Sequence, residues 1–160
     1  MKSIYATIIV LLVANLVATI WFGVERNSLP TTQIESKNAL PEHIDKHVRD
    51  ELYERFVSAY NDRDYNAVYD LFSDSSKAQI DKKDILKTMD ELVEYFDSII
   101  QGGFSHSEFL GHQGDTKQFR LVYPVKFSEN SKFGTSGKLY VTLAVRGGEH
   151  EVWGFNLRSE

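Results

Sequence analysis

The sequence predicts an α+β domain in which three amino-terminal helices pack on a four-stranded antiparallel sheet, preceded by one transmembrane helix. Residues 3–24 contain neither a charged residue nor a histidine. Apolar residues then recur at intervals of three and four up to Ile100, and at intervals of two after Gly103. These are the periods of a helix and of a strand. Helices followed by strands along the chain are typical of an α+β fold.

The composition of the 160-residue chain limits its possible functions. Residues 27–160 hold 16 basic and 22 acidic residues, and their number suits one domain with a tail. This acidic balance argues against a nucleic-acid partner, because contacts to phosphates need clustered lysine and arginine. The chain has no cysteine, which excludes disulfides, thiolate metal sites and a cysteine nucleophile.

Residues 4–24 are the predicted membrane anchor. As a helix with a rise of about 1.5 Å per residue, they span roughly 30 Å, the thickness of the hydrocarbon core of a bilayer. Trp21 and Phe22 are typical of the membrane interface. A cleaved signal peptide is the alternative and would release a secreted domain. It fits less well, because cuts after Ala18 or Gly23 both leave a large residue at the −3 position.

The residues on either side of the anchor predict its orientation and a tether. Residues 1–3 carry Lys2 and the amino group, so they are expected on the cytoplasmic side, with the domain outside. Residues 25–41 contain two prolines and several polar residues, without an apolar period. This stretch is therefore a predicted linker.

Apolar stripes and capping residues predict the three helices. The first covers residues 41–61, where apolar residues recur at steps of three and four. Asp64 is placed to cap a short second helix. Asp81 is placed to cap the third helix, whose apolar stripe continues to Ile100 before the glycine pair at 102–103 ends it.

Four strands follow, and alternation of apolar and polar residues predicts each of them. The expected strands cover residues 104–113, 117–128, 137–146 and 149–158. Gly147 and Gly148 between the last two are a signal for a two-residue hairpin turn.

Three stretches resemble the nuclear transport factor two-like superfamily. They are FVSAYNDRDY at 56–65, LFS at 71–73 and VWGFNL at 152–157, and the last is similar to small exported or membrane-anchored members of unknown function. The resemblance implies a curved sheet in a cone-shaped domain over residues 42–160. With the absence of cysteine, it implies a single-pass protein of a bacterial inner membrane, with the domain in the periplasm or outside. Superfamily members include isomerases, dehydratases, polyketide cyclases, dimeric adaptors and membrane-anchored assembly subunits, so the fold selects no activity.

Candidate catalytic residues are few. If the domain is an enzyme, His106, Tyr123 and Asn156 are the candidate site, as a general base, an oxyanion donor and an amide donor. The simpler interpretation is that histidines on a strand belong to its solvated face. No metal site is predicted, since His43 and His47 are four apart without a third ligand. No cofactor is predicted either, because the glycine pairs lack the context of a phosphate loop.

The expected function is therefore a membrane-anchored extracytoplasmic binding or scaffold domain without catalysis. Its partners would be the membrane, through residues 4–24, and a second copy or a membrane protein at the aromatic-rich sheet. The alternative is a small isomerase, cyclase or hydrolase, or a carrier of a hydrophobic ligand, that uses the pocket of the cone.

Overall fold

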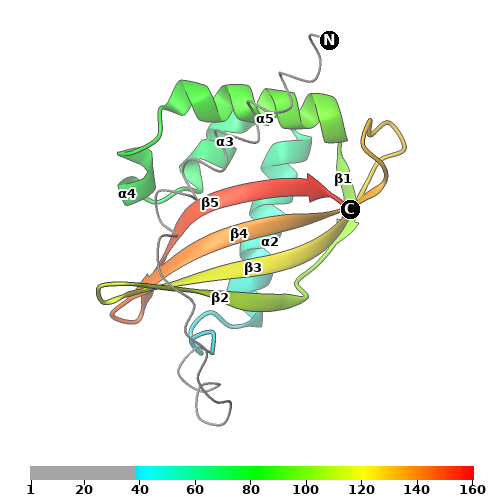
Figure 1. The fold of residues 1–160 in the computed structure, drawn as a ribbon. Coiled ribbons are helices and arrows are strands. Elements are labelled where there is room, and N and C mark those ends of the chain that lie inside the picture. The colour runs from blue at the N-terminus through cyan, green and yellow to red at the C-terminus, as the bar shows by residue number, and fades with distance from the viewer. Residues whose placement is uncertain (1–38) are drawn as a thin grey trace, which may run out of the picture. The chain divides into compact units, whose positions relative to one another are not determined.

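The computed structural model of the chain describes residues 39–160. The predicted anchor at 4–24 and most of the predicted linker lie outside these residues. Within residues 39–160, no helix is long and apolar enough to cross a membrane. The described part consists of helices packed against a five-stranded antiparallel sheet, which confirms the predicted α+β class (Figure 1).

Helix α2, Lys46–Asn61, begins later than the predicted start at residue 41. Asp45 caps it, because its side chain accepts a hydrogen bond from the amide of Val48 at 3.0 Å. Pro41 instead belongs to a turn, in which its carbonyl accepts from the amide of Ile44 at 2.9 Å. The helix therefore starts after its capping residue, Asp45, and not at Pro41.

Three further helices follow α2. Helix α3, Tyr65–Asp70, begins after Asp64, which accepts from the amide of Ala67 at 3.0 Å and confirms the predicted cap. The short helix α4, Asp74–Lys77, was not predicted from the polar stretch that contains it. Helix α5, Lys82–Phe96, begins after the predicted cap Asp81.

The prediction for the end of the third helix is wrong. Helix α5 stops at Phe96, and Ile99–Gly102 forms strand β1 instead of a last helical turn. Asp97 breaks the helix because its φ of 55° lies in the left-handed region. Its carboxylate accepts hydrogen bonds from Ser128 at 2.5 Å and from Arg63 at 3.1 Å, and these contacts hold the strained backbone in place.

The five strands form one antiparallel sheet. Besides β1, they are β2 His106–Gln113, β3 Thr116–Phe127, β4 Ser136–Arg146 and β5 Glu149–Ser159. The order is β1-β3-β4-β5, and β2 pairs with the other end of the same edge of β3. The four predicted strands correspond to β2 to β5. Gly147 and Gly148 both have positive φ, at 60° and 88°, as the predicted two-residue hairpin requires.

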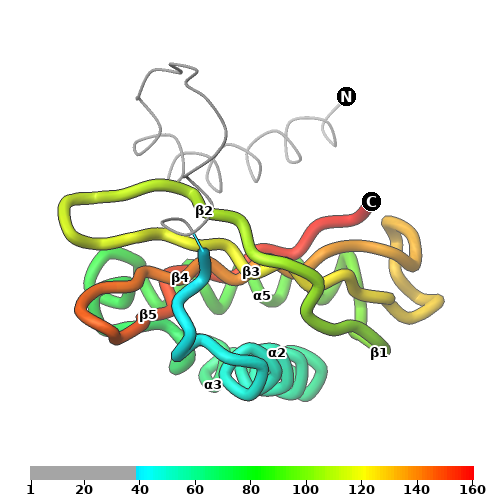
Figure 2. The backbone as a smooth tube through the Cα atoms, turned by 90° about the horizontal axis from the view of Figure 1, so that it is seen from below, coloured from blue at the N-terminus to red at the C-terminus, as the bar shows by residue number. Residues whose placement is uncertain are grey.

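The hydrophobic core lies between the helices and one face of the sheet. Figure 2 shows α2 and α3 together on this side. Alternate residues of β3 and β4 point into it and are almost fully buried: Phe119, Leu121, Tyr123, Val125, Phe127, Leu139, Val141 and Leu143. From α2, Phe56 and Tyr60 pack against them. The residues between the buried ones therefore project from the opposite face, where no described helix packs.

Candidate functional site

The face of the sheet opposite the core, called the outer face below, has a polar and aromatic surface. The strand register places its residues across four strands: His106 and Glu108 on β2, Arg120 on β3, Lys138 and Tyr140 on β4, and Asn156 and Arg158 on β5. The residues named on β2, β4 and β5 are two apart on each strand, so alternation puts them on one face of that strand. The register pairs Arg120 with Glu108, Lys138 with Arg158 and Tyr140 with Asn156, which puts them on the same face of the sheet.

Tyr140 lies at the centre of this group. The guanidinium carbon of Arg120 lies 5.4 Å from the centroid of the Tyr140 ring, and that of Arg158 lies 5.7 Å from it. Both arginines reach the ring from diagonal positions on the neighbouring strands, β3 and β5. These distances are within the range of a cation–π interaction. One aromatic ring thus orients two positive charges on the same surface.

Polar partners fix the two arginines. Arg120 forms an ion pair with Glu108 at 3.2 Å, and His106 Nε2 lies 3.7 Å from the other oxygen of that carboxylate. Arg158 Nε donates to Asn156 Oδ1 at 2.8 Å. Within residues 39–160, the two terminal nitrogens of Arg158 have no hydrogen-bond partner, so they are available to a ligand.

Lys138 adds a further cation beside this group. It pairs with Glu160 at 2.6 Å, and this hydrogen bond raises the pKa of Lys138 above its ordinary value. Lys138 faces Arg158 directly across the β4–β5 pair, so two positive side chains lie side by side on the outer face.

The structure separates the three candidate catalytic residues. His106 pairs with Val122 in the register, so Tyr123, the next residue of β3, points to the core side. Its side chain is fully buried, its hydroxyl donates to the carbonyl of Arg49 at 2.9 Å, and burial raises its pKa. His106 and Asn156 share the outer face, but β3 and β4 lie between their strands. Three strand spacings separate them by roughly 14 Å, too far to act on one reacting atom.

Arg120, Tyr140 and Arg158 were missed as a group by sequence reasoning. The alternation that predicts β4 also predicts that Tyr140 faces away from Leu139 and Val141. The pattern does not predict the register, which is the alignment of β3 and β5 with β4. The register is what brings Arg120 and Arg158 to the Tyr140 ring.

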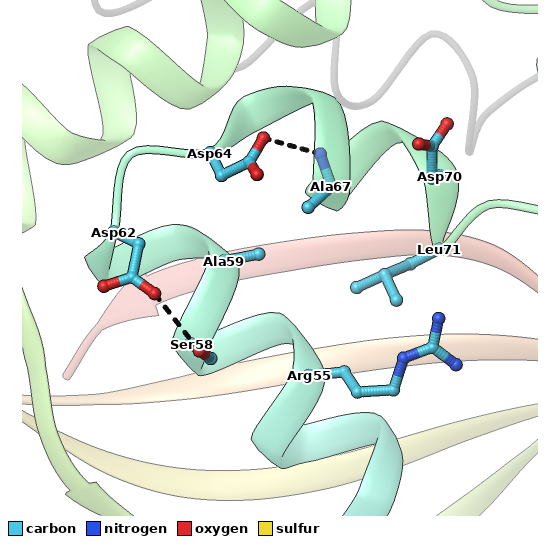
Figure 3. A pocket seen from close by; sticks show the side chains of 8 residues that line it. All are labelled: Arg55, Ser58, Ala59, Asp62, Asp64, Ala67, Asp70 and Leu71. Carbon is cyan, nitrogen blue, oxygen red and sulfur yellow. Dashed lines mark hydrogen bonds between the residues drawn. The ribbon is translucent and has the colours of Figure 1, made fainter.

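A surface pocket lies between α2 and α3 and is acidic (Figure 3). Its carboxylates belong to Asp62, Asp64 and Asp70. Asp62 accepts a hydrogen bond from Ser58 at 3.3 Å and Asp64 caps α3, so both have structural roles. Within residues 39–160, no group of three or more histidines and carboxylates is placed to hold a metal ion.

His43 lies in the turn before α2, and its ring stacks on the ring of His150. The ring centroids of His43 and His150 are 5.9 Å apart with an interplanar angle of 28°. Burial lowers the pKa of the His150 imidazole, and the nearby His43 lowers it further. The stacked pair thus connects the turn before α2 to the β4–β5 hairpin.

This pair predicts a pH dependence of stability. Because folding lowers the pKa of His150, the unfolded chain binds the proton more tightly, and stability falls as the pH drops through the imidazole range. We expect a lower Tm at about pH 5 than at about pH 7.5, with part of the difference removed by His150→Asn. Thermal unfolding at several pH values measures this. His47→Asn, at an exposed position of α2, is the control; equal pH profiles for wild type and His150→Asn would contradict the prediction.

No protein-family model matches this chain, and no curated protein matches it.

Proposed function

We propose that this chain is a binding module that holds an acidic segment of a partner protein on the outer face of its sheet, and that it is not an enzyme. The observation that carries this proposal is the pair of guanidinium groups, Arg120 and Arg158, which flank the ring of Tyr140 at 5.4 and 5.7 Å. Arginine beside an aromatic ring suits carboxylate recognition, because the ring orients the planar fork.

The distribution of charge supports an acidic partner. The chain as a whole is acidic, with a net charge of −5, and the pocket between α2 and α3 contains three aspartates. The outer face instead gathers Arg120, Lys138 and Arg158 around Tyr140. Glu108 and Glu160 pair with Arg120 and Lys138, whereas Arg158 forms no ion pair within the described residues. This remaining positive charge favours an acidic partner.

The packing gives less support to the alternative of an enzyme or a hydrophobic-ligand carrier. Both would use the space between helices and sheet. Large side chains occupy that space, and Tyr60, Phe119 and Tyr123 are each 0% exposed. The separation of Tyr123 from His106 and Asn156 leaves no assembled set of acid, base and oxyanion donor among them.

The proposal includes the location predicted from the sequence. Residues 4–24 would anchor the chain in a bacterial inner membrane, and residues 25–41 would tether a cone-shaped domain like those of the nuclear transport factor two-like superfamily outside the cytoplasm. The support is the uncharged stretch at 3–24. A carboxy-terminal alkaline phosphatase fusion, active only outside the cytoplasm, tests the orientation. The mass of the membrane-extracted chain tests the alternative of a cleaved signal.

Charge reversal on the outer face tests the binding proposal. The full chain in detergent is titrated against a fluorescent glutamate-rich peptide, and binding is measured by anisotropy. We expect salt-sensitive binding that Arg120→Glu with Arg158→Glu weakens by about tenfold or more, because two charge-assisted contacts are lost and repulsion is gained.

A matched control places the same change of charge on a helix. Lys83→Glu with Lys87→Glu alters two exposed residues of α5 and is expected to leave peptide binding within about twofold of wild type, since it changes only long-range electrostatics. Equal losses for the two double variants would mean that the overall net charge, not the outer face, binds the peptide. Absence of binding by the wild type would overturn the proposal.

A further inference from the structure

Arg49 on α2 has an unusual environment for a charged side chain. Its Nε is enclosed and makes no hydrogen bond. Within residues 39–160, its guanidinium also forms no ion pair, and its contact is with the ring of Phe104, whose centroid lies 4.2 Å from the guanidinium carbon. The side chain as a whole is only partly buried, so its terminal nitrogens, unlike Nε, are not enclosed.

The carboxylates nearest to Arg49 in the chain have other partners. Asp45 accepts the hydrogen bond that caps α2, from the amide of Val48 at 3.0 Å. Asp50 pairs with Lys46, one turn before it on the same helix. Neither forms an ion pair with Arg49, although Arg49 is near enough to Asp45 to contribute to the lowered pKa of that carboxyl. The guanidinium therefore keeps donors that no carboxylate of the described residues occupies.

Tyr53 supplies a second donor beside Arg49. It follows Arg49 by four residues on α2, so the two side chains are neighbours on one face of the helix. Its hydroxyl lies close to Gly102. If this glycine carried a Cβ atom, that atom would be 2.5 Å from the hydroxyl oxygen. Within the described part of the chain, this hydroxyl has no hydrogen-bond partner, and burial raises its pKa, so it remains a donor at neutral pH.

Aromatic rings surround these two donors. The Tyr53 ring stacks on Tyr123 with centroids 5.3 Å apart, and Phe104 meets Tyr123 edge-on at 5.8 Å. The arrangement thus combines a planar guanidinium, a hydroxyl and apolar walls, at the side of α2 that faces the β1–β2 connection.

We propose that Arg49 and Tyr53 form a binding site for a carboxylate carried on an apolar body. The guanidinium fork matches the two oxygens of a carboxylate, and the phenol hydroxyl donates to one of them. Phe104 and the Tyr53 ring contact the apolar part of the ligand. This site is on the core side of the sheet and is independent of the acidic partner proposed for the outer face.

Benzoate is the probe for this site, with acetate and inorganic phosphate as comparisons. The full chain is followed by NMR at the Nε–H signals of its arginines, and the signal lost in Arg49→Met identifies Arg49. We expect a saturable shift of that signal with benzoate, and an affinity lower for acetate because acetate lacks the apolar body. A response to phosphate alone would overturn the carboxylate assignment, and no response to any of the three would overturn the site.

Variants distinguish binding from folding. Arg49→Met keeps the length of the side chain and is expected to abolish benzoate binding without lowering Tm, since it removes an enclosed polar group that has no partner. Tyr53→Phe removes only the hydroxyl and is expected to weaken binding by about tenfold, the effect of one good hydrogen bond to a charged group.

Arg55→Met is the matched control, because Arg55 is an exposed residue of the same helix that pairs with Glu51. It should leave benzoate binding unchanged. Unchanged binding in both Arg49→Met and Tyr53→Phe would overturn the proposal, whatever the result for the outer face.

Discussion

Replacing Gly137 by alanine is expected to destabilise the domain by about 3 kcal/mol, the upper part of the usual range for overpacking. A Cβ atom at this position of β4 would lie 2.2 Å from the carbonyl oxygen of Arg158 and 2.6 Å from an atom of the Phe127 ring. The first contact is with the backbone of β5, so the two strands would have to separate. Urea denaturation of wild type and variant measures the change in the free energy of unfolding.

Gly154→Ala is the control for this loss. Gly154 lies on β5, its φ is not in the left-handed region, and a Cβ atom there would meet nothing within 4 Å. We expect the free energy of unfolding to change by less than about 0.5 kcal/mol. Similar losses at both positions would show that strand geometry in general, and not the close approach at Gly137, explains the result.

Phe56→Ala is expected to cost about 3–5 kcal/mol, as large-to-small changes of a buried phenylalanine do. Phe56 is 1% exposed, and its ring stacks on Phe155 and on Tyr60 at centroid distances of 4.7 and 5.7 Å. The truncated side chain would leave a cavity between α2 and the sheet, bounded by rings that cannot collapse freely. Thermal and urea denaturation both report this loss.

Ile100→Ala gives the matching apolar truncation at the surface. Ile100 is 65% exposed on the short strand β1, so its removal should change stability by less than about 0.5 kcal/mol. A loss at Phe56 that is no larger than the loss at Ile100 would contradict the assignment of α2 to the core.

Local signals in the sequence predicted most of the fold. Asp64 and Asp81 cap helices where their short side chains reach the free amides of the first turn. The predicted end of the third helix is wrong for a physical reason. Ile99 and Ile100 continue the apolar stripe of α5, and neither glycine nor proline marks the point where the helix ends. The break depends on Asp97, which is held by Arg63 and Ser128 from distant parts of the chain.

The candidate sites were less predictable, because they depend on register and on contacts distant in sequence. Alternation along β3 and β4 does not by itself show that Tyr123 and Tyr140 lie on opposite faces of the sheet. That conclusion also needs the alignment of the two strands. Sequence patterns equally fail to predict that Arg49 forms no ion pair within the described residues, because Asp45 and Asp50 have other partners. From their spacing in the sequence alone, Asp45, Arg49 and Asp50 would be expected to pair with one another.

The order of the elements has a consequence for biosynthesis. Phe56 of α2 stacks on Phe155 of β5, and this strand leaves the ribosome after every helix of the described domain has done so. Until then, the apolar side of α2 has no sheet to pack on, and an amphipathic helix without its partner surface is prone to aggregate. Translation arrested between α5 and β4 would therefore release a fragment that needs a chaperone or is degraded.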